Sequence, residues 1–99
     1  MSASKRSKRR LAYLVEFDKR VSKDIDKLPK EVARIIVEKC SVLEENPLYG
    51  PNIKRLSSNL YRMEVLRVWR VAYTVEGSKV LIVLVGHRKD CYDRLSRRM

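Results

Sequence analysis

The chain has 99 residues, enough for one small domain with a single hydrophobic core, and its 44% hydrophobic residues with only 3 Gly and 3 Pro predict that most of it folds. Lys and Arg total 23 against 12 Asp and Glu, and the resulting net charge of +11 favours a polyanionic partner, either nucleic acid or an acidic protein segment. No run approaches the roughly 18 apolar residues of a membrane helix, and the N-terminus has no apolar signal core, so we expect no membrane partner and no secretion.

The two cysteines, Cys40 and Cys91, are isolated and far apart, and the chain has a single histidine. These residues do not match the ligand spacing of a zinc site, so we expect no metal and no other cofactor. Unpaired cysteines are typical of reducing compartments, which favours a cytoplasmic location.

The first ten residues, MSASKRSKRR, are rich in serine and basic residues and contain no acidic residue. This composition predicts a disordered basic leader over residues 1–10, followed by one folded domain over residues 11–99. The leader either contacts RNA electrostatically or is a solvated tail without a specific role.

The N-terminal half predicts one strand and two helices. Leu11–Phe17 is short, apolar and rich in strand-forming residues, so we predict the first strand there. Asp18 is a suitable N-cap for a helix over Lys19–Leu28, in which apolar residues recur at helical spacing. Pro29 ends that helix and can open the next, predicted over Lys30–Glu45. The first cysteine lies on the apolar stripe of this second helix and is predicted to be a small buried hydrophobe.

The C-terminal half predicts strands. Asn-Pro and Gly-Pro pairs indicate a loop over residues 46–59. Three strand-like runs follow, Tyr61–Leu66, Val68–Val75 and Val80–Val85, and a turn at Gly77-Ser78 joins the last two. Their β-branched and aromatic residues recur with period 2, which predicts consecutive antiparallel strands.

Two short helices joined by a tight turn must bury their apolar stripes together against one face of the sheet. We therefore predict an α+β fold of order βααβββ, with a helical hairpin on one face of a mainly antiparallel, twisted sheet. A short basic tail or helix follows over Asp90–Met99. In the middle run the expected core face consists of Trp69, Val71, Tyr73 and Val75. Arg70 then points to the opposite face, which we expect to stay open for a partner.

Three arginines lie inside or at the end of the predicted strands, where charged residues are normally rare: Arg62, Arg70 and Arg88. Guanidinium groups gathered on one sheet face form a cradle for phosphate. Their convergence depends on the register of the strands, so the alternative, a solvated face of a basic protein, stays open. His87 and Tyr92 lie just beyond the last run.

Several short motifs, in order from Leu11 to Leu95, resemble the RelE/ParE superfamily of toxin–antitoxin toxins, and within it the RelE-like branch. The matching motifs are Trp69-Arg70-Val71-Ala72-Tyr73, Gly86-His87-Arg88 and Tyr92, with Phe17-Asp18, Leu28-Pro29 and the helix exit from Leu43 to Pro47 upstream. The resemblance implies the toxin of a type II system, a metal-independent, ribosome-dependent endoribonuclease that cleaves mRNA by 2′-OH attack on the adjacent phosphate. It also implies the partners: a cognate antitoxin, mRNA and ribosomal RNA in the ribosomal A site, and DNA only indirectly through the antitoxin complex.

The resemblance also assigns roles to single residues. Arg70 resembles the strand arginine that contacts the scissile phosphate, and Arg88 resembles the arginine that stabilises charge and protonates or supports the leaving group. Tyr92 resembles the C-terminal tyrosine that orients or deprotonates the nucleophile. Arg62 stands where the family has a lysine, and Glu64 replaces a second family lysine two positions further on.

RNA cleavage without a metal needs a base for the 2′-OH, cations around the phosphate and an acid for the 5′-oxygen. Arginine is a good charge clamp but a poor base, so proton transfer is left to His87 or Tyr92. Each of these two also has a structural alternative: a histidine bonded to a backbone carbonyl, or a tyrosine ring packed over the end of the sheet. Further basic residues are expected to bind RNA phosphates or to be solvated: Lys54, Arg55, Arg67, Lys89 and Arg94.

Two other functions stay open. A ParE-like toxin would bind DNA gyrase instead of cutting RNA. The combination of Arg70, Arg88 and Tyr92 argues against that branch, and Glu64 argues slightly for it. A catalytically inactive relative would bind its antitoxin and act as a co-repressor. It would retain the positive charge but would not cleave RNA, and this combination would distinguish it from the nuclease.

Overall fold

The computed structural model describes residues 12–98. The predicted basic leader, Leu11 of the first predicted strand and Met99 lie outside the described residues. The elements are, in chain order, β1 (Leu14–Phe17), α2 (Val21–Asp26), α3 (Lys30–Val42), β2 (Ile53–Arg55), β3 (Leu60–Val65), β4 (Trp69–Glu76), β5 (Lys79–His87) and α4 (Cys91–Arg98). Within this described part of the chain, no helix is long and apolar enough to cross a membrane.

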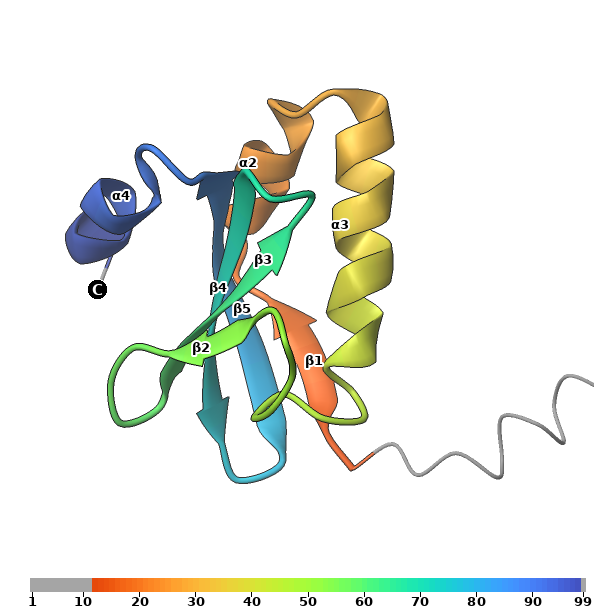
Figure 1. Ribbon diagram of the computed structural model, residues 1–99, viewed down its shortest axis with the longest axis vertical. Coiled ribbons are helices and arrows are strands. Elements are labelled where there is room, and N and C mark those ends of the chain that lie inside the picture. Colours follow the sequence, from red (N-terminus) through yellow and green to blue (C-terminus); the bar gives the residue numbers. More distant parts are fainter. Residues whose placement is uncertain (1–11, 99) are drawn as a thin grey trace, which may run out of the picture.

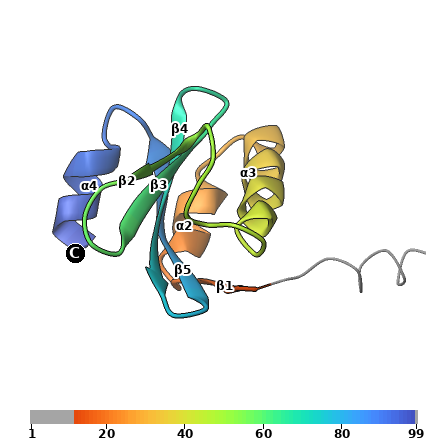
Figure 2. The same ribbon diagram turned by 60° about the horizontal axis from the view of Figure 1, so that its bottom comes forward.

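The predicted α+β fold is confirmed. The five strands form one sheet in the order β1-β5-β4-β3-β2, in which β1 runs parallel to β5 and the other neighbours are antiparallel. α2 and α3 form the predicted hairpin on one side of the sheet, and the C-terminal basic segment is helix α4 on the other side (Figure 1). Figure 2 shows the same separation from a second direction. The helical hairpin carries the chain from β1 at one edge of the sheet to β2 at the other edge.

The strand β2 lies inside the segment that the sequence predicted to be a loop. It pairs antiparallel with β3 at the edge of the sheet, with Ile53 opposite Met63. Its 3 residues are too few to show an alternating pattern, so the sequence carries no strand signal there.

The main core lies between the sheet and the α2–α3 hairpin. Its buried residues are Val21, Ile36, Cys40, Leu43, Met63, Val65, Val71, Tyr73, Val80, Ile82 and Val85. Trp69 packs against this cluster, as predicted for the core face. Burial raises the pKa of the Cys40 thiol to about 12, in agreement with its predicted role as a small buried hydrophobe. The buried Tyr73 hydroxyl donates a hydrogen bond to the Pro47 carbonyl at 2.6 Å and ties the loop after α3 to the sheet.

The opposite face of the sheet is not fully open, which corrects the expectation from the sequence. Helix α4 packs on it and closes a second small core of Ala72, Val83, Leu84, Cys91 and Leu95. A register shift explains how β5 supplies this cluster, because Ala72 pairs with Leu84 while Tyr73 pairs with Ile82. The extra residue, Val83, therefore joins its neighbour Leu84 on the α4 side instead of alternating to the main core.

Both helices of the hairpin are shorter than predicted. Residues 19 and 20 form a turn, because the Asp18 carboxylate accepts hydrogen bonds from the backbone N–H and the guanidinium of Arg20. These bonds, the guanidinium contact first, lower the pKa of Asp18 to about 2. α3 ends at Val42, three residues before the predicted end, and turns carry the chain on to Glu45.

The edge of β5 beyond β1 is closed by side chains from two helices. β1 pairs with β5 only as far as Ile82. Beyond that point Asp24 of α2 accepts a hydrogen bond from the Val85 N–H at 3.1 Å, and Arg98 of α4 donates to the Val83 carbonyl at 2.7 Å. Backbone groups that have no β1 partner are therefore satisfied by a carboxylate and a guanidinium.

The same Asp24 carboxylate joins α2 to α4. It is only 3% exposed and accepts hydrogen bonds from Arg94 at 2.5 Å and from Arg98 at 2.8 Å. Gly86 lets Arg94 lie close to β5, because a Cβ at this position would be 2.7 Å from Arg94 Nη1. One buried carboxylate thus holds α4, which carries Tyr92, against the sheet.

Candidate active site

The strand register brings two of the predicted arginines to the same face of the sheet. Arg62 of β3 is paired with Ala72 of β4, and Glu64 with Arg70. Because cross-strand partners and residues two apart share a face, Arg62, Glu64 and Arg70 all lie on the side that carries α4. Lys54 of β2 is the partner of Arg62 and extends this basic row to the edge of the sheet.

Glu64 lies between the two arginines. Its Oε1 is 3.6 Å from Arg62 Nη1 and 3.8 Å from Arg70 Nη2. The arginine side chains are 17% and 13% exposed, whereas that of Glu64 is 33% exposed. Arg62 Nε is buried and has no hydrogen-bond partner in the part of the chain that the structure describes. A buried donor without an acceptor costs free energy, so the fold holds the Arg62 guanidinium in this position at an energetic cost.

Arg70 is also fixed by the loop between β3 and β4. Its Nη1 donates to the carbonyl of Arg67 at 3.0 Å and contacts that of Trp69 at 3.3 Å. Leu66 and Arg67 have φ of 52° and 68°, a left-handed conformation that non-glycine residues adopt at a cost. The sequence did not predict this turn because it contains no glycine or asparagine.

The same loop contacts the segment that follows β5. The Arg88 N–H donates a hydrogen bond to the Val68 carbonyl at 2.7 Å, and the Arg88 side chain is exposed. This bond places the backbone of Arg88 beside the loop that holds the Arg70 guanidinium. The three predicted arginines are therefore linked through the backbone. Arg62 and Arg70 lie on the paired strands β3 and β4, and Arg88 is bonded to the left-handed loop between these strands.

His87 lies on the other face of the sheet. It is paired with Trp69, and the two rings meet edge-on with centroids 5.3 Å apart. Its Nδ1 accepts a hydrogen bond from the Lys89 N–H at 3.1 Å, which assigns the proton of the neutral ring to Nε2. The structure does not bring His87 together with Arg62 and Arg70.

Tyr92 lies on α4 at a shallow cleft beside the basic row. Its side chain is half exposed, and the cleft is lined by Leu56, Ser57, Leu60, Tyr92, Leu95 and Ser96. Leu60 precedes Arg62 by two positions on β3, so the cleft lies on the same face of the sheet as Arg62. The neighbouring Cys91 is buried; burial raises the pKa of its thiol, and the charges of Arg70, Arg94 and Arg62 oppose that rise. The first turn of α4 therefore lies within the field of the arginine cluster.

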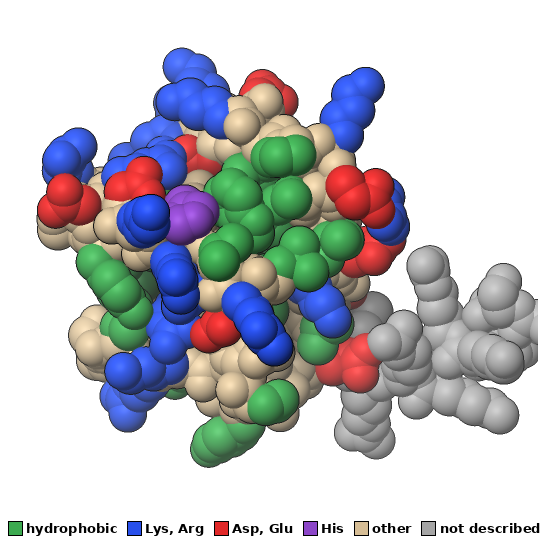
Figure 3. Space-filling model, turned by 45° about the horizontal axis from the view of Figure 1, so that its top comes forward, with side chains coloured by type: hydrophobic (Ala, Val, Ile, Leu, Met, Phe, Trp, Pro, Cys, Tyr) green, Lys and Arg blue, Asp and Glu red, His purple; other side chains and the backbone are tan. Residues whose placement is uncertain are grey.

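The structure does not gather all five residues predicted to bind RNA on this face, because Arg55 is paired with Tyr61, which packs against the main core on the other side. Lys54, Arg67 and Lys89 are exposed. Arg55 donates hydrogen bonds to the carbonyls of residues 57 and 58, and Arg94 is engaged with the buried carboxylate of α2. Figure 3 shows lysine and arginine side chains around the single histidine, next to an apolar patch.

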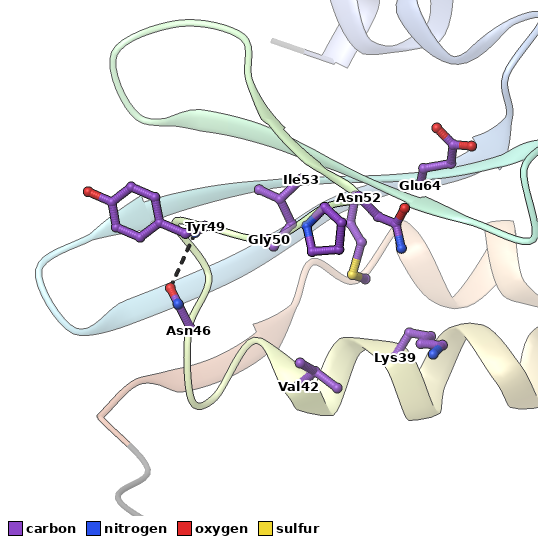
Figure 4. A pocket seen from close by; sticks show the side chains of 10 residues that line it. Lys39, Val42, Asn46, Tyr49, Gly50, Asn52, Ile53 and Glu64 are labelled. Atoms are coloured by element: carbon purple, nitrogen blue, oxygen red, sulfur yellow. Dashed lines mark hydrogen bonds between the residues drawn. The ribbon is translucent and has the colours of Figure 1, made fainter.

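A separate cavity of about 250 Å³ lies between α3 and the edge strand β2. Figure 4 shows Val42 and Lys39 on one wall and Ile53 on the other, with Tyr49 at one end. Asn46 accepts hydrogen bonds from the N–H groups of residues 48 and 49 and shapes the loop that carries the Tyr49 ring, which is 76% exposed. Residues 12–98 contain no group of three or more His, Cys, Asp or Glu side chains arranged to hold a metal ion.

Solved structures share this fold over most of their length. A chain of the archaeal RelE–RelB complex from Pyrococcus horikoshii OT3 is 28% identical, with 78% of this chain and 96% of that chain covered and a TM-score of 0.68. A mutant of the Escherichia coli toxin RelE in the free state is 25% identical, with 89% and 98% covered and a TM-score of 0.72. A chain of the toxin–antitoxin complex RelBE2 from Mycobacterium tuberculosis is 26% identical, with 81% and 95% covered and a TM-score of 0.68.

A helical hairpin and a C-terminal helix on opposite sides of a small mixed sheet thus define a RelE-like toxin fold. The family model described as "ParE toxin of type II toxin-antitoxin system, parDE" matches residues 15–92. The chain therefore belongs to this family, within the RelE/ParE superfamily that its motifs indicated. A search of curated protein sequences gives no significant match.

Proposed function

We propose that this toxin is a metal-independent, ribosome-dependent endoribonuclease that cleaves mRNA. The observation that carries the proposal is that the strand register places Arg62 and Arg70 on one face of the sheet, with guanidinium nitrogens of both near the Glu64 carboxylate. A phosphate oxygen is the acceptor that suits a guanidinium best, because the bond is charge-assisted and its geometry matches. A phosphate group of RNA would therefore be a suitable ligand for this arginine-bearing face.

The proposed reaction begins with attack of the ribose 2′-oxygen on the adjacent phosphorus. The bond from phosphorus to the 5′-oxygen breaks, which leaves a 2′,3′-cyclic phosphate and a 5′-hydroxyl. Extra negative charge develops on the phosphoryl oxygens, and Arg62, Arg70 and Arg88 are proposed to stabilise it. Tyr92 is proposed to take part in proton transfer, since its half-exposed ring borders a cleft on the same face of the sheet as Arg62.

His87 is proposed to support the site from the opposite face. Its Nδ1 is occupied by the Lys89 N–H, and its ring packs against Trp69. These contacts hold the turn that carries Arg88, whose backbone bonds to the β3–β4 loop. Of the two residues first considered for proton transfer, the contacts therefore favour Tyr92.

The exposed basic residues are proposed to hold the RNA on either side of the cut. Lys54, Arg67 and Lys89 are free to contact flanking phosphates of mRNA or ribosomal RNA, whereas Arg55 and Arg94 contribute mainly positive potential. With a net charge of +11, association should weaken steeply as salt rises.

A cognate antitoxin is the second proposed partner. Two of the similar structures are toxin–antitoxin complexes, which supports this proposal. An antitoxin segment with acidic residues would complement the charge, and apolar residues in it would fit the cavity beside Tyr49. Contact with DNA would come only through the antitoxin. The two free, buried cysteines are compatible with the cytoplasm, where ribosomes and such a complex are found.

A second candidate is a ParE-like toxin that binds DNA gyrase and does not cut RNA. It is favoured by the family model that matches the chain and by Glu64, which places a carboxylate between the two arginines. Inhibition of gyrase supercoiling without RNA cleavage would identify this function.

The test is a translation-coupled cleavage assay on programmed ribosomes. Arg70→Ala, Arg88→Ala and Tyr92→Phe should each lose at least about a hundredfold in cleavage rate. Arg34→Ala is the matched control, because Arg34 is an exposed arginine on α3 whose guanidinium bonds to Glu31 and Glu38. Cleavage by the wild type that survives all three site substitutions would refute the assigned roles, and no cleavage by folded wild type would refute the nuclease.

A further inference from the structure

We propose that Glu64 is the general base that takes the proton of the attacking 2′-OH. The inference rests on the proposed endoribonuclease function and adds a catalytic residue to it. The sequence marked Glu64 only as an acidic residue in place of a basic one. The register instead puts its carboxylate on the same face as both phosphate-binding arginines.

The position of the carboxylate suits a base. The Glu64 Oε1 lies 3.6 Å and 3.8 Å from the guanidinium nitrogens of Arg62 and Arg70, beyond hydrogen-bond reach. Its oxygens therefore keep lone pairs that can accept a proton. Glu64 is also about twice as exposed as either arginine, at 33% against 17% and 13%, so a substrate hydroxyl can reach it. A phosphate gripped by the two arginines would lie next to this carboxylate.

The backbone holds Glu64 in place from both sides. Its N–H donates to the Asn52 carbonyl at 2.8 Å, in the segment just before β2, and Arg70 is its partner on β4. A catalytic group on a paired strand is held more accurately than one on a loop. No movement of the chain is needed to bring the carboxylate to the arginine pair.

The other candidates do not fill this role as well. Arginine remains protonated at neutral pH, and His87 lies on the opposite face with its Nδ1 occupied. A phenol hydroxyl is a proton donor at neutral pH, so Tyr92 suits the leaving 5′-oxygen better than the nucleophile. The Glu64 carboxylate offers acceptor oxygens and carries no proton of its own, so it is the remaining candidate for the base.

The proposed step balances without any co-reactant. The 2′-hydroxyl proton passes to the Glu64 carboxylate as the bond from the 2′-oxygen to phosphorus forms. The bond from phosphorus to the 5′-oxygen then breaks, its electron pair stays on that oxygen, and a proton from Tyr92 or water completes the 5′-hydroxyl. The proton on Glu64 returns to solvent.

The first test is Glu64→Gln, which keeps the size of the side chain and removes its charge. The cleavage rate on saturating ribosomes should fall by at least about a hundredfold. RNA binding should be unchanged or tighter, because one negative charge is lost beside two arginines. Glu38→Gln removes the same charge from the exposed face of α3 and should leave the rate unchanged. Glu64→Asp retains a shorter carboxylate and should recover part of the activity.

A substrate with an altered leaving group distinguishes the residue that accepts the 2′-OH proton from the residue that protonates the 5′-oxygen. When sulfur replaces the bridging 5′-oxygen, the leaving group no longer needs a proton. Glu64→Gln should remain slow on this substrate, whereas Tyr92→Phe should recover.

Two results would overturn the inference while leaving the nuclease intact: cleavage by Glu64→Gln within about threefold of wild type, or its recovery on the sulfur substrate. The first would assign Glu64 to neutralising the arginines only. The absence of cleavage by folded wild type would refute the proposed function and this step together.

Discussion

The substitution Asp24→Asn should destabilise the protein far more than an ordinary surface change. The Asp24 carboxylate is 3% exposed and is bound by Arg94, by Arg98 and by the Val85 N–H. Asparagine can keep the bond from Val85, but it leaves two partly buried guanidinium groups without their counter-ion. Breaking a buried ion pair from one side costs about 3–5 kcal/mol. For a domain of this size, that loss lowers the Tm by more than about 10 °C.

Asp24 should also make the stability of the protein depend on pH in the acidic range. Burial raises the pKa of Asp24, but the hydrogen bonds from Arg98 and Val85 and the charges of Arg98 and Arg94 lower it more, so it lies below the ordinary 3.8. A carboxyl group with a lowered folded pKa adds stability above its unfolded pKa and loses it as the pH falls through the folded value. Below about pH 4 the wild type should therefore lose stability faster than Asp24→Asn.

Urea and thermal unfolding from pH 7 to pH 2 measure both effects. Asp26→Asn is the control, because Asp26 is an exposed aspartate on the same helix. Hydrogen exchange should report the earliest loss of protection in α4, whose attachment depends on Asp24. A Tm of Asp24→Asn within about 3 °C of the control, with α4 equally protected, would refute the account of how α4 is held.

Two further stability predictions and one on binding follow from single contacts. Gly86→Ala should lower the free energy of unfolding by about 1–3 kcal/mol in urea titration, because the new Cβ would displace the Arg94 guanidinium; an unchanged midpoint would contradict that contact. Tyr73→Phe should cost about 1–3 kcal/mol, since it leaves the buried Pro47 carbonyl without its donor, and no change would show that water replaces the hydroxyl. Lys54→Ala should weaken RNA binding and reduce the slope of log affinity against log salt by about 1, and an unaltered slope would exclude a phosphate contact at this residue.

The sequence predicted the parts of the fold that depend on local pattern. Period-2 alternation located β3, β4 and β5, and the break at Pro29 separated the two helices. It missed β2, which is too short for a pattern, and the left-handed turn at Leu66 and Arg67, which lacks the usual turn residues. The covering of the second face was also missed, because the pattern of Asp90–Met99 predicts a short basic tail or helix but not the surface on which it packs.

The candidate active site could likewise be predicted from the sequence only in part. The sequence named Arg62 and Arg70, but only the register tells that they share a face and that Glu64 lies between them. His87 follows Gly86 in the motif, yet the alternation of β5 puts it beside Trp69 on the other face. The Asp24 network joins residues 70 and 74 positions apart, a contact for which one sequence offers no signal.

The most direct test of the nuclease proposal uses purified wild-type protein, programmed ribosomes and two mRNAs. The second mRNA differs only by a single 2′-deoxynucleotide at the cleavage position mapped on the first. We predict cleavage of the unmodified mRNA to a 2′,3′-cyclic phosphate and a 5′-hydroxyl, and no cleavage at the deoxynucleotide. Equal cleavage of both mRNAs would contradict attack by the 2′-OH. No cleavage of either by folded protein, combined with inhibition of gyrase, would replace the nuclease with a gyrase-binding toxin.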